Sequence, residues 1–252
     1  MKTLRQTFFI TLSIVALASQ LPAQTPAPAA ANAAAEHSNS AIIPVPRTGS
    51  ATNRQSQVLQ RAKDNPGACD IVFIGDSITQ GWEGAGKNVW QKYYGNRKCL
   101  NLGVGGDRTQ HVLWRFEQGQ LDGLKPKVAV LMIGTNNSNK DDNSEADILE
   151  GVQLIVKQIR ERLPDTKLII NDIFPRGKTF STQRGKILQV NQALEKLADG
   201  KMIFYIPVGS QMIESDGSIS QGMMRDYLHP GEQGYEIWAA AMEPKVKELL
   251  GQ

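Results

Sequence analysis

Short apolar runs alternate with longer segments of helical periodicity from about residue 51 onward. The runs predict five strands, at 70–75, 98–102, 127–134, 167–172 and 202–206. Their near-continuous apolar character is typical of parallel strands that are covered on both faces. Residues 145–163 carry apolar side chains at three- and four-residue steps and predict a helix, as do residues 230–250. The alternation predicts one α/β domain at residues 51–252, built as a three-layer α/β/α sandwich.

The N-terminal region follows a different pattern. Lys2 and Arg5 precede an apolar stretch at 8–18, and small residues then offer cleavage after Ala18 or after Ala23. This order is typical of a secretory signal peptide, which we place at residues 1–23. The apolar stretch has about 11 residues, whereas a membrane span needs about 20, so stable membrane insertion is not expected.

Residues 24–50 are rich in Ala, Pro and polar side chains. Such a composition buries too little apolar surface to offset the entropy of ordering, and it predicts a flexible tether. Together with the signal peptide, it favours an exported protein, periplasmic or extracellular.

The charge of the chain excludes one broad class of partner. The formal net charge is only +3, the leader supplies two of the positive charges, and the basic residues form no cluster. A nucleic-acid partner is therefore not expected.

The two cysteines, Cys69 and Cys99, stand just before the first and second predicted strands. If these strands are neighbours, both thiols lie at the same end of the sheet. In an oxidising compartment, a disulfide closing a loop of about 30 residues would stabilise the fold by about 3–4 kcal/mol. Two unpaired buried thiols fit the sequence as well.

A serine stands directly after the first predicted strand, in Gly75-Asp76-Ser77-Ile78. Further motifs follow in Asn101–Asp107, Gly134–Asn137 and Asp226–His229. Open α/β sheets place their chemistry at the carboxyl ends of the strands, so these motifs are expected to converge. A serine hydroxyl acts as a nucleophile only with a base in reach and with donors for the oxyanion that forms.

The chain holds three histidines that could serve as the base. His37 lies in the expected tether, and His111 lies inside a predicted helix at 109–118, where packing or exposure is its expected role. His229 follows Asp226 by three residues in an irregular segment. There the carboxylate can fix the imidazole tautomer and leave the other nitrogen for Ser77.

Donors for the oxyanion are available at Gly106, whose backbone N–H can approach a substrate, and at Asn136, whose side chain carries an amide. Each could instead merely shape a turn. Trp82 and Trp90 are interpreted as core residues, with a sugar-stacking wall as the alternative. Surface or helix-support roles are expected for a set of three basic residues: Arg108, Arg115 and Arg176.

Taken together, Gly75–Ser77, Gly106, Asn136 and Asp226-x-x-His229 resemble the conserved blocks of the SGNH, or GDSL-type, hydrolase superfamily. Within that superfamily, the chain is similar to the catalytic subunits of the platelet-activating factor acetylhydrolase Ib group. The segments that carry this similarity are 101–116, 125–137 and 226–235, and the resemblance extends over about 52–250.

The resemblance implies that Ser77 is the nucleophile, His229 the base and Asp226 its orienting partner. It also implies an oxyanion hole made by the N–H groups of Ser77 and Gly106 and the amide of Asn136. A flavodoxin-like five-stranded parallel sheet of order 2-1-3-4-5 is expected, with no metal or cofactor. The related subunits dimerise, so a homodimer is a further expectation.

The resemblance favours a serine esterase that removes short acyl groups, above all acetyl. The intracellular relatives lack a signal peptide, so their ether-phospholipid substrate is not transferred to an exported chain. Acetylated carbohydrate, or another small ester, is the expected substrate. The alternatives are a lysophospholipase or arylesterase and, from a different class, a non-catalytic glycan- or lipid-binding module. Pro230-Gly231-Glu232 also depart from the more apolar continuation of the relatives, which puts substrate specificity in doubt.

Overall fold

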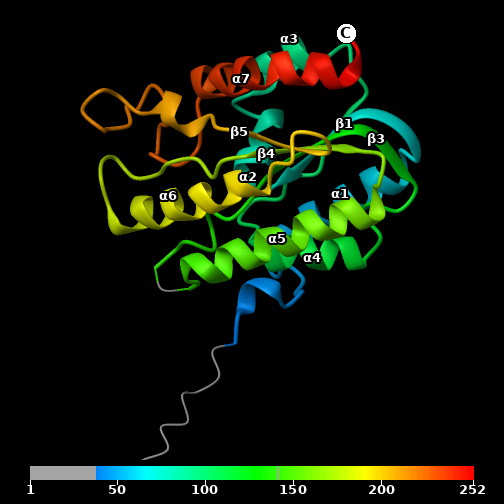
Figure 1. Ribbon diagram of the computed structural model, residues 1–252, viewed down its shortest axis with the longest axis horizontal. Helices are drawn as coiled ribbons and strands as arrows, with labels where there is room; N and C mark the ends of the chain where they lie inside the picture. Colours follow the sequence, from blue (N-terminus) through cyan, green and yellow to red (C-terminus); the bar gives the residue numbers. More distant parts are fainter. Residues whose placement is uncertain (1–37, 141) are drawn as a thin grey trace, which may run out of the picture. The chain divides into compact units, whose positions relative to one another are not determined.

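A computed structural model describes residues 38–140 and 142–252. Within them, five strands form one parallel sheet in the order β2-β1-β3-β4-β5. The strands are β1 (Gly67–Gly75), β2 (Cys99–Asn101), β3 (Leu124–Met132), β4 (Lys167–Asn171) and β5 (Ile203–Ile206). This is the flavodoxin-like order, and the expected three-layer α/β/α sandwich is confirmed (Figure 1).

Helices cover both faces of the sheet (Figure 1). One face carries α1 (Ala51–Lys63), α4 (Thr109–Glu117), α5 (Glu145–Arg162) and α6 (Thr182–Leu194). The other face carries α3 (Lys87–Tyr94) and α7 (Glu232–Leu250). Short segments complete the described chain: α2 (Ser77–Gln80) and the 3₁₀ turns η1 (Ser40–Ile42), η2 (Gly81–Glu83), η3 (Glu195–Leu197) and η4 (Gly209–Met212). The last helix begins after Pro230, because Gly231 is its N-cap.

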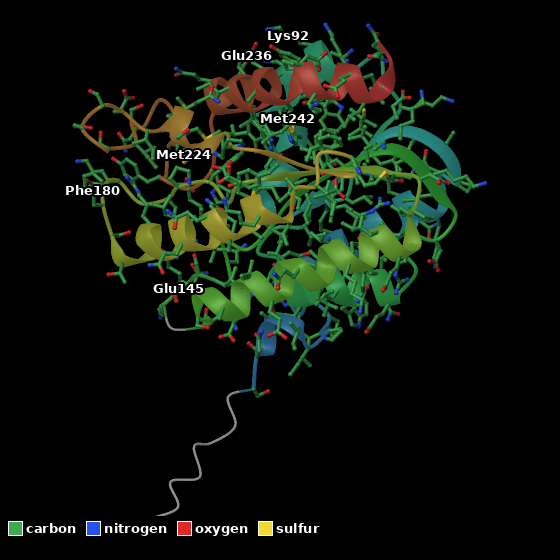
Figure 2. The ribbon with its side chains drawn as sticks, in the orientation of Figure 1. Lys92, Glu145, Phe180, Met224, Glu236 and Met242 are labelled. Carbon is green, nitrogen blue, oxygen red and sulfur yellow. The ribbon has the colours of Figure 1, made fainter. Side chains whose placement is uncertain are left out.

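The interior strand β1 explains why the core has two halves. Successive side chains of a strand point to opposite faces, so Val72 and Ile74 pack toward α1 and α4, whereas Ile71 and Phe73 pack toward α3 and α7. All four are fully buried. At the surface, an ion pair between Lys92 of α3 and Glu236 of α7 joins the two helices of the second face (Figure 2).

Aromatic rings fill the half of the core beneath α7. The ring of Trp82 lies 4.6 Å from that of Tyr235 and 4.9 Å from that of Trp238, measured between centroids. The Tyr235 hydroxyl donates a hydrogen bond to the carbonyl of Ile78 at 2.7 Å. Helix α7 is therefore anchored directly below the short helix α2, which follows β1.

The packed domain begins earlier than the sequence suggests. The expected signal peptide at 1–23 and the first part of the expected tether lie outside the described residues, but residues 38–50 pack on the domain and are not a flexible tether. Ala41 is fully buried, and its carbonyl accepts a hydrogen bond from Thr109 Oγ1 at 2.7 Å. We call residues 38–50 the N-terminal strap. In the described part of the chain, none of the helices combines the length and apolar character needed to span a bilayer.

The cysteines are free thiols, so the disulfide alternative is not the one that the structure shows. The strands β1 and β2 are neighbours, as the bridge requires, with Ile71 opposite Cys99. Cys69, however, packs in the half of the core beneath α1, whereas Cys99 packs against the half beneath α3. The two side chains thus serve opposite faces of the sheet.

Candidate active site

The turn after β1 presents Ser77 at the carboxyl edge of the sheet. Asp76 is the N-cap of α2, and its Oδ1 accepts the backbone N–H of Ile78 at 2.9 Å. A Cβ at Gly75 would lie 2.2 Å from Thr79 Oγ1 and 2.3 Å from the Met132 carbonyl, so the turn requires glycine. Ser77 is the first residue of α2 and remains partly exposed.

The structure brings three of the sequence-predicted side chains into contact. His229 Nε2 lies 2.9 Å from Ser77 Oγ, and His229 Nδ1 lies 2.6 Å from Asp226 Oδ2. Ser77 and His229 are 152 residues apart in the chain, so the contact depends on the complete sheet and on α7. The order carboxylate, imidazole, hydroxyl is that of a catalytic triad.

The turn from Asp226 to His229 is organised by the carboxylate itself. Asp226 Oδ1 accepts the backbone N–H groups of Leu228 at 3.1 Å and of His229 at 2.8 Å. These bonds and the imidazole lower the pKa of Asp226 to about 2, against the opposing effect of burial. Tyr227 adopts a left-handed conformation, with φ of +59°, which turns the chain so that His229 points back toward Ser77.

The loop after β2 lies beside Ser77. Gly106 has φ of +74°, a conformation that glycine adopts without strain. The backbone N–H of the preceding Gly105 donates to Gln80 Oε1 at 2.7 Å, which ties the loop to α2. Among the described residues, no hydrogen bond engages the N–H of Gly106 or of Ser77. Both donors are thus available to an incoming oxyanion.

Asn136, after β3, is held against the same loop. Its side-chain amide donates one N–H to the backbone carbonyl of Asp107 at 2.9 Å, and an amide nitrogen carries two N–H groups. The Asp107 carboxylate is fully buried and pairs with the fully buried guanidinium of Arg115. Arg115 is therefore a buried support of this loop. Of the two roles that the sequence left open, the surface role is wrong and the support role agrees with the structure.

The carboxyl group of Asp76, next to Ser77, is fully buried. Burial raises the pKa of its carboxyl to about 7, although the Ile78 N–H and the charges of His229 and Arg176 oppose the shift. Its Oδ2 is buried and has no partner among the described residues. Arg176 is half-buried; its Nη1 donates to the Thr135 carbonyl at 3.0 Å, next to Asn136. Burial lowers the pKa of Arg176, while the nearby carboxylates of Asp76 and Asp226 oppose this.

His111 is not brought to the site. Its Nδ1 accepts the backbone N–H of Arg108 at 2.9 Å, which caps the start of α4. Burial lowers the pKa of His111 to about 4, with the charges of Arg47 and Arg108 acting in the same direction. The imidazole is therefore neutral near pH 7, and its role is structural.

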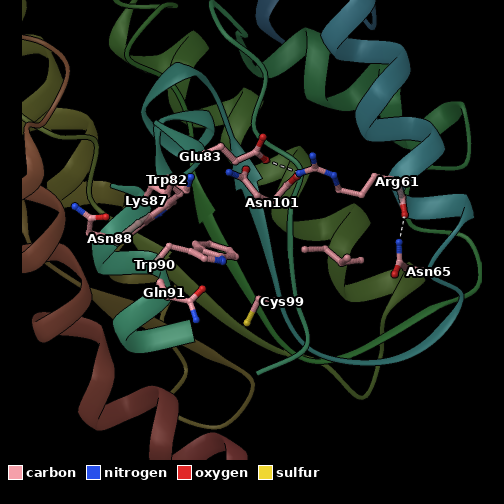
Figure 3. A pocket seen from close by; sticks show the side chains of 11 residues that line it. Arg61, Asn65, Trp82, Glu83, Lys87, Asn88, Trp90, Gln91, Cys99 and Asn101 are labelled. Atoms are coloured by element: carbon pink, nitrogen blue, oxygen red, sulfur yellow. Dashed lines mark hydrogen bonds and ion pairs between the residues drawn. The ribbon is translucent and has the colours of Figure 1, made fainter. Parts of the chain in front are cut away.

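The two tryptophans after the nucleophile differ in exposure. Trp82 is almost fully buried among the aromatic rings, as its interpretation as a core residue predicts. Trp90 is half-buried and extends into a cavity of about 650 Å³ between α3, α1 and β2 (Figure 3). Arg61 borders this cavity from α1, and Ser77 does not line it. The sugar-stacking alternative would therefore apply to this cavity and not to the surroundings of Ser77.

Sequence reasoning missed Arg47, which lies in the N-terminal strap and whose Nη1 donates to the Gly106 carbonyl at 3.1 Å. No pattern in the residues around Arg47 signals this contact, since its partner Gly106 lies 59 residues further along the chain. No group of three or more His, Cys, Asp or Glu residues is arranged to hold a metal ion in the described part of the chain.

Comparison with known proteins adds independent findings. The chain matches the model of the GDSL-like Lipase/Acylhydrolase family over residues 73–237. Platelet-activating factor acetylhydrolase IB subunit alpha1 from Homo sapiens is 34% identical over 184 residues, which cover 73% of this chain and 78% of that subunit. A GDSL-like lipase from Bacteroides thetaiotaomicron superposes with a TM-score of 0.62 at 18% identity, covering 77% of this chain and 97% of that one. A carbohydrate esterase family 3 protein from Talaromyces cellulolyticus superposes with a TM-score of 0.52 at 18% identity, covering 73% and 98%.

Proposed function

We propose that this chain, which belongs to the GDSL-like lipase/acylhydrolase family, is an exported serine esterase that removes short acyl groups, above all acetyl. Family membership makes the chain a hydrolase. The observation that carries the mechanism is the run of contacts from Ser77 Oγ through His229 to Asp226, at 2.9 and 2.6 Å.

In the proposed mechanism, His229 Nε2 takes the proton of Ser77 as Oγ bonds to the ester carbonyl carbon. The carbonyl π electrons move to oxygen, and this oxyanion accepts hydrogen bonds from the N–H groups of Ser77 and Gly106 and from the free N–H of Asn136. The tetrahedral intermediate then collapses, and the leaving alcohol takes the proton from His229. Water, deprotonated by His229, attacks the acyl-enzyme and releases the carboxylic acid and Ser77.

The acyl preference rests on the curated relatives, which are acetylhydrolase subunits. An acetyl ester outside the cell suggests acetylated carbohydrate, and the fold is shared with a carbohydrate esterase. These similarities support the substrate proposal, while the contacts at Ser77 support ester hydrolysis in general.

The test is hydrolysis of p-nitrophenyl esters from acetate to palmitate by the wild type, Ser77→Ala and Ser210→Ala. Ser210 lies in η4 and is exposed, so its variant is a matched control for loss of a serine hydroxyl. We expect turnover that decreases with acyl length, is abolished by Ser77→Ala and is unchanged by Ser210→Ala. A preference for long chains would favour a lysophospholipase. If the wild type hydrolyses none of the esters but binds acetylated xylan, a glycan-binding module would be favoured.

Export has a separate test. The full chain is expressed with its leader, and the intact mass of the purified protein is measured. Removal of the residues up to Ala18 or Ala23 is expected, because small residues there follow the apolar stretch. A mature protein that retains Met1 would contradict export by this route.

A further inference from the structure

The side chain of Arg47 lies against the peptide that joins Gly106 to Asp107. Its Nη1 donates to the Gly106 carbonyl at 3.1 Å, and its Nε lies 3.7 Å from Asp107 Oδ1. A Cβ at Gly106 would be 2.8 Å from Arg47 Nη2, which shows how closely the guanidinium packs on the glycine. The backbone N–H of Arg47 donates to the buried Gln55 at 2.8 Å, so the base of the side chain is fixed as well.

The N-terminal strap is hydrogen-bonded to α4 and to the residues just before α5, both of which follow the loop that carries Gly106. Thr109, the first residue of α4, bonds the carbonyl of the buried Ala41, and the Val45 N–H donates to the Gln110 carbonyl at 3.3 Å. Asn143 Nδ2 donates to Ser40 Oγ at 3.0 Å. The strap thus runs along the start of α4, and Arg47, near the C-terminal end of the strap, contacts the loop at Gly106.

The Gly106–Asp107 peptide is held from both sides. Its N–H donates to the Val104 carbonyl at 3.1 Å within the loop, and its carbonyl accepts from Arg47 outside the loop. Glycine has no Cβ to restrict rotation, and at φ of +74° its neighbouring peptide planes can turn at little cost. The two oxyanion donors of this region flank that peptide. The Gly106 N–H belongs to the peptide before it, and the Asp107 carbonyl, which accepts from the Asn136 amide, belongs to the peptide after it. Rotation of the Gly106–Asp107 peptide is therefore coupled to both donors through the backbone of Gly106 and Asp107. Donors stabilise a transition state only when they are oriented before the reaction.

We propose that the N-terminal strap positions the oxyanion hole and that Arg47 is its positioning residue. The inference rests on the proposed function, since it assigns the orientation of that site to a segment outside the predicted domain. Arg47 acts through Gly106 and Asp107 and does not touch the reacting atoms. Arg115 pairs with the Asp107 carboxylate inside the core, so the loop stays folded when Arg47 is replaced.

The test compares Arg47→Met, Arg47→Lys and Arg108→Gln in the full chain. Arg108 belongs to the same loop, but its guanidinium pairs with Asp142, so its variant controls for loss of a nearby charge. With p-nitrophenyl acetate, we expect Arg47→Met to lower kcat about tenfold with little change in KM, because loss of an oxyanion donor itself costs about 10²- to 10³-fold. Arg47→Lys keeps a donor and should be intermediate, and Arg108→Gln should match the wild type.

A second readout separates positioning from a merely structural role. A trifluoromethyl ketone forms a tetrahedral adduct with a nucleophilic serine, and its affinity should decrease in Arg47→Met in proportion to kcat/KM. Unchanged ketone affinity, with or without a lower thermal midpoint, would overturn the proposal.

A third measurement is the rate at which a fluorophosphonate labels Ser77 in the wild type and in Arg47→Met. This rate can be measured without knowing the natural ester substrate. A wild type that neither labels nor hydrolyses rejects the proposed function itself. A wild type that labels no faster than Arg47→Met rejects only the role of the strap.

Discussion

Replacement of Asp226 by Asn is expected to lower activity by imposing the wrong tautomer on His229. Asp226 Oδ1 accepts two backbone N–H groups, from Leu228 and His229, so this position must remain an acceptor oxygen. In Asp226→Asn the amide oxygen takes that place, and the NH₂ group then faces His229 Nδ1. The imidazole must accept there, which moves its proton to Nε2, opposite Ser77 Oγ. A base that already carries a proton cannot take another.

The expected loss follows from that geometry. In the serine protease triad, the same exchange lowers kcat by about 10⁴-fold, which corresponds to about 5.5 kcal/mol of barrier. Asp226→Ala removes the acceptor of both backbone N–H groups, but the turn is exposed, so water can accept from them and from the Nδ1 proton of the half-exposed His229. That variant keeps the productive tautomer and should be less harmful. The structure therefore predicts an unusual order, with the isosteric variant less active than the truncated one.

The assay is kcat/KM for p-nitrophenyl acetate from pH 5 to 9, with Asp216→Asn as the control. Asp216 also accepts a backbone N–H two residues ahead, from Ser218 at 2.9 Å, and it lies in an exposed turn. That variant should match the wild type. If Asp226→Asn kept a tenth or more of the activity, or exceeded Asp226→Ala, the tautomer argument would be refuted.

Three further predictions concern buried groups. Asp107→Asn leaves the fully buried Arg115 without its counter-charge and should lower the unfolding free energy by about 3–5 kcal/mol in urea, and a loss below about 1 kcal/mol would contradict it. Burial raises the pKa of Asp76 from 3.8 to about 7, so the native state holds a proton that the unfolded chain releases. The contribution of this group to stability decreases as pH rises from about 4 to 7, while the lowered pKa of His111 acts in the opposite direction. Asp76→Asn should therefore make the slope of stability against pH more positive in that range, and an unchanged slope would contradict it. Burial raises the thiol pKa values to about 11 for Cys69 and about 12 for Cys99, so a disulfide reagent should react slowly at pH 8 and count two thiols after denaturation.

The sheet could be predicted because its strands are nearly continuous apolar runs, and such runs are typical of a parallel sheet buried on both faces. The strand limits differ by a few residues: β3 begins at Leu124, where Pro126 and two lysines interrupt the apolar pattern. The contact of Ser77 with His229 could also be predicted from the sequence, since motifs at the ends of strands converge in this fold.

The N-terminal strap could not be predicted, because its structure depends on distant partners. It continues an Ala- and Pro-rich segment that has the composition of a linker. The groups that hold it come from elsewhere in the chain: Thr109 bonds the Ala41 carbonyl, and Gln55 and Gly106 bond Arg47. The pairing of Arg115 with Asp107 is hidden for a related reason: a lone arginine on a helix usually faces solvent, and only the position of the loop beside α4 buries it.

The distance of 152 residues between Ser77 and His229 also has a consequence for the timing of folding. A chain synthesised from its N-terminus completes all five strands of the described sheet before Asp226, His229 and α7 leave the ribosome. The turn at Ser77 lacks its contact with His229, and the aromatic core beneath α7 lacks Tyr235 and Trp238, until those last residues arrive. We therefore expect the nascent chain to acquire the contact between Ser77 and His229 only when synthesis is almost finished, together with the aromatic core beneath α7.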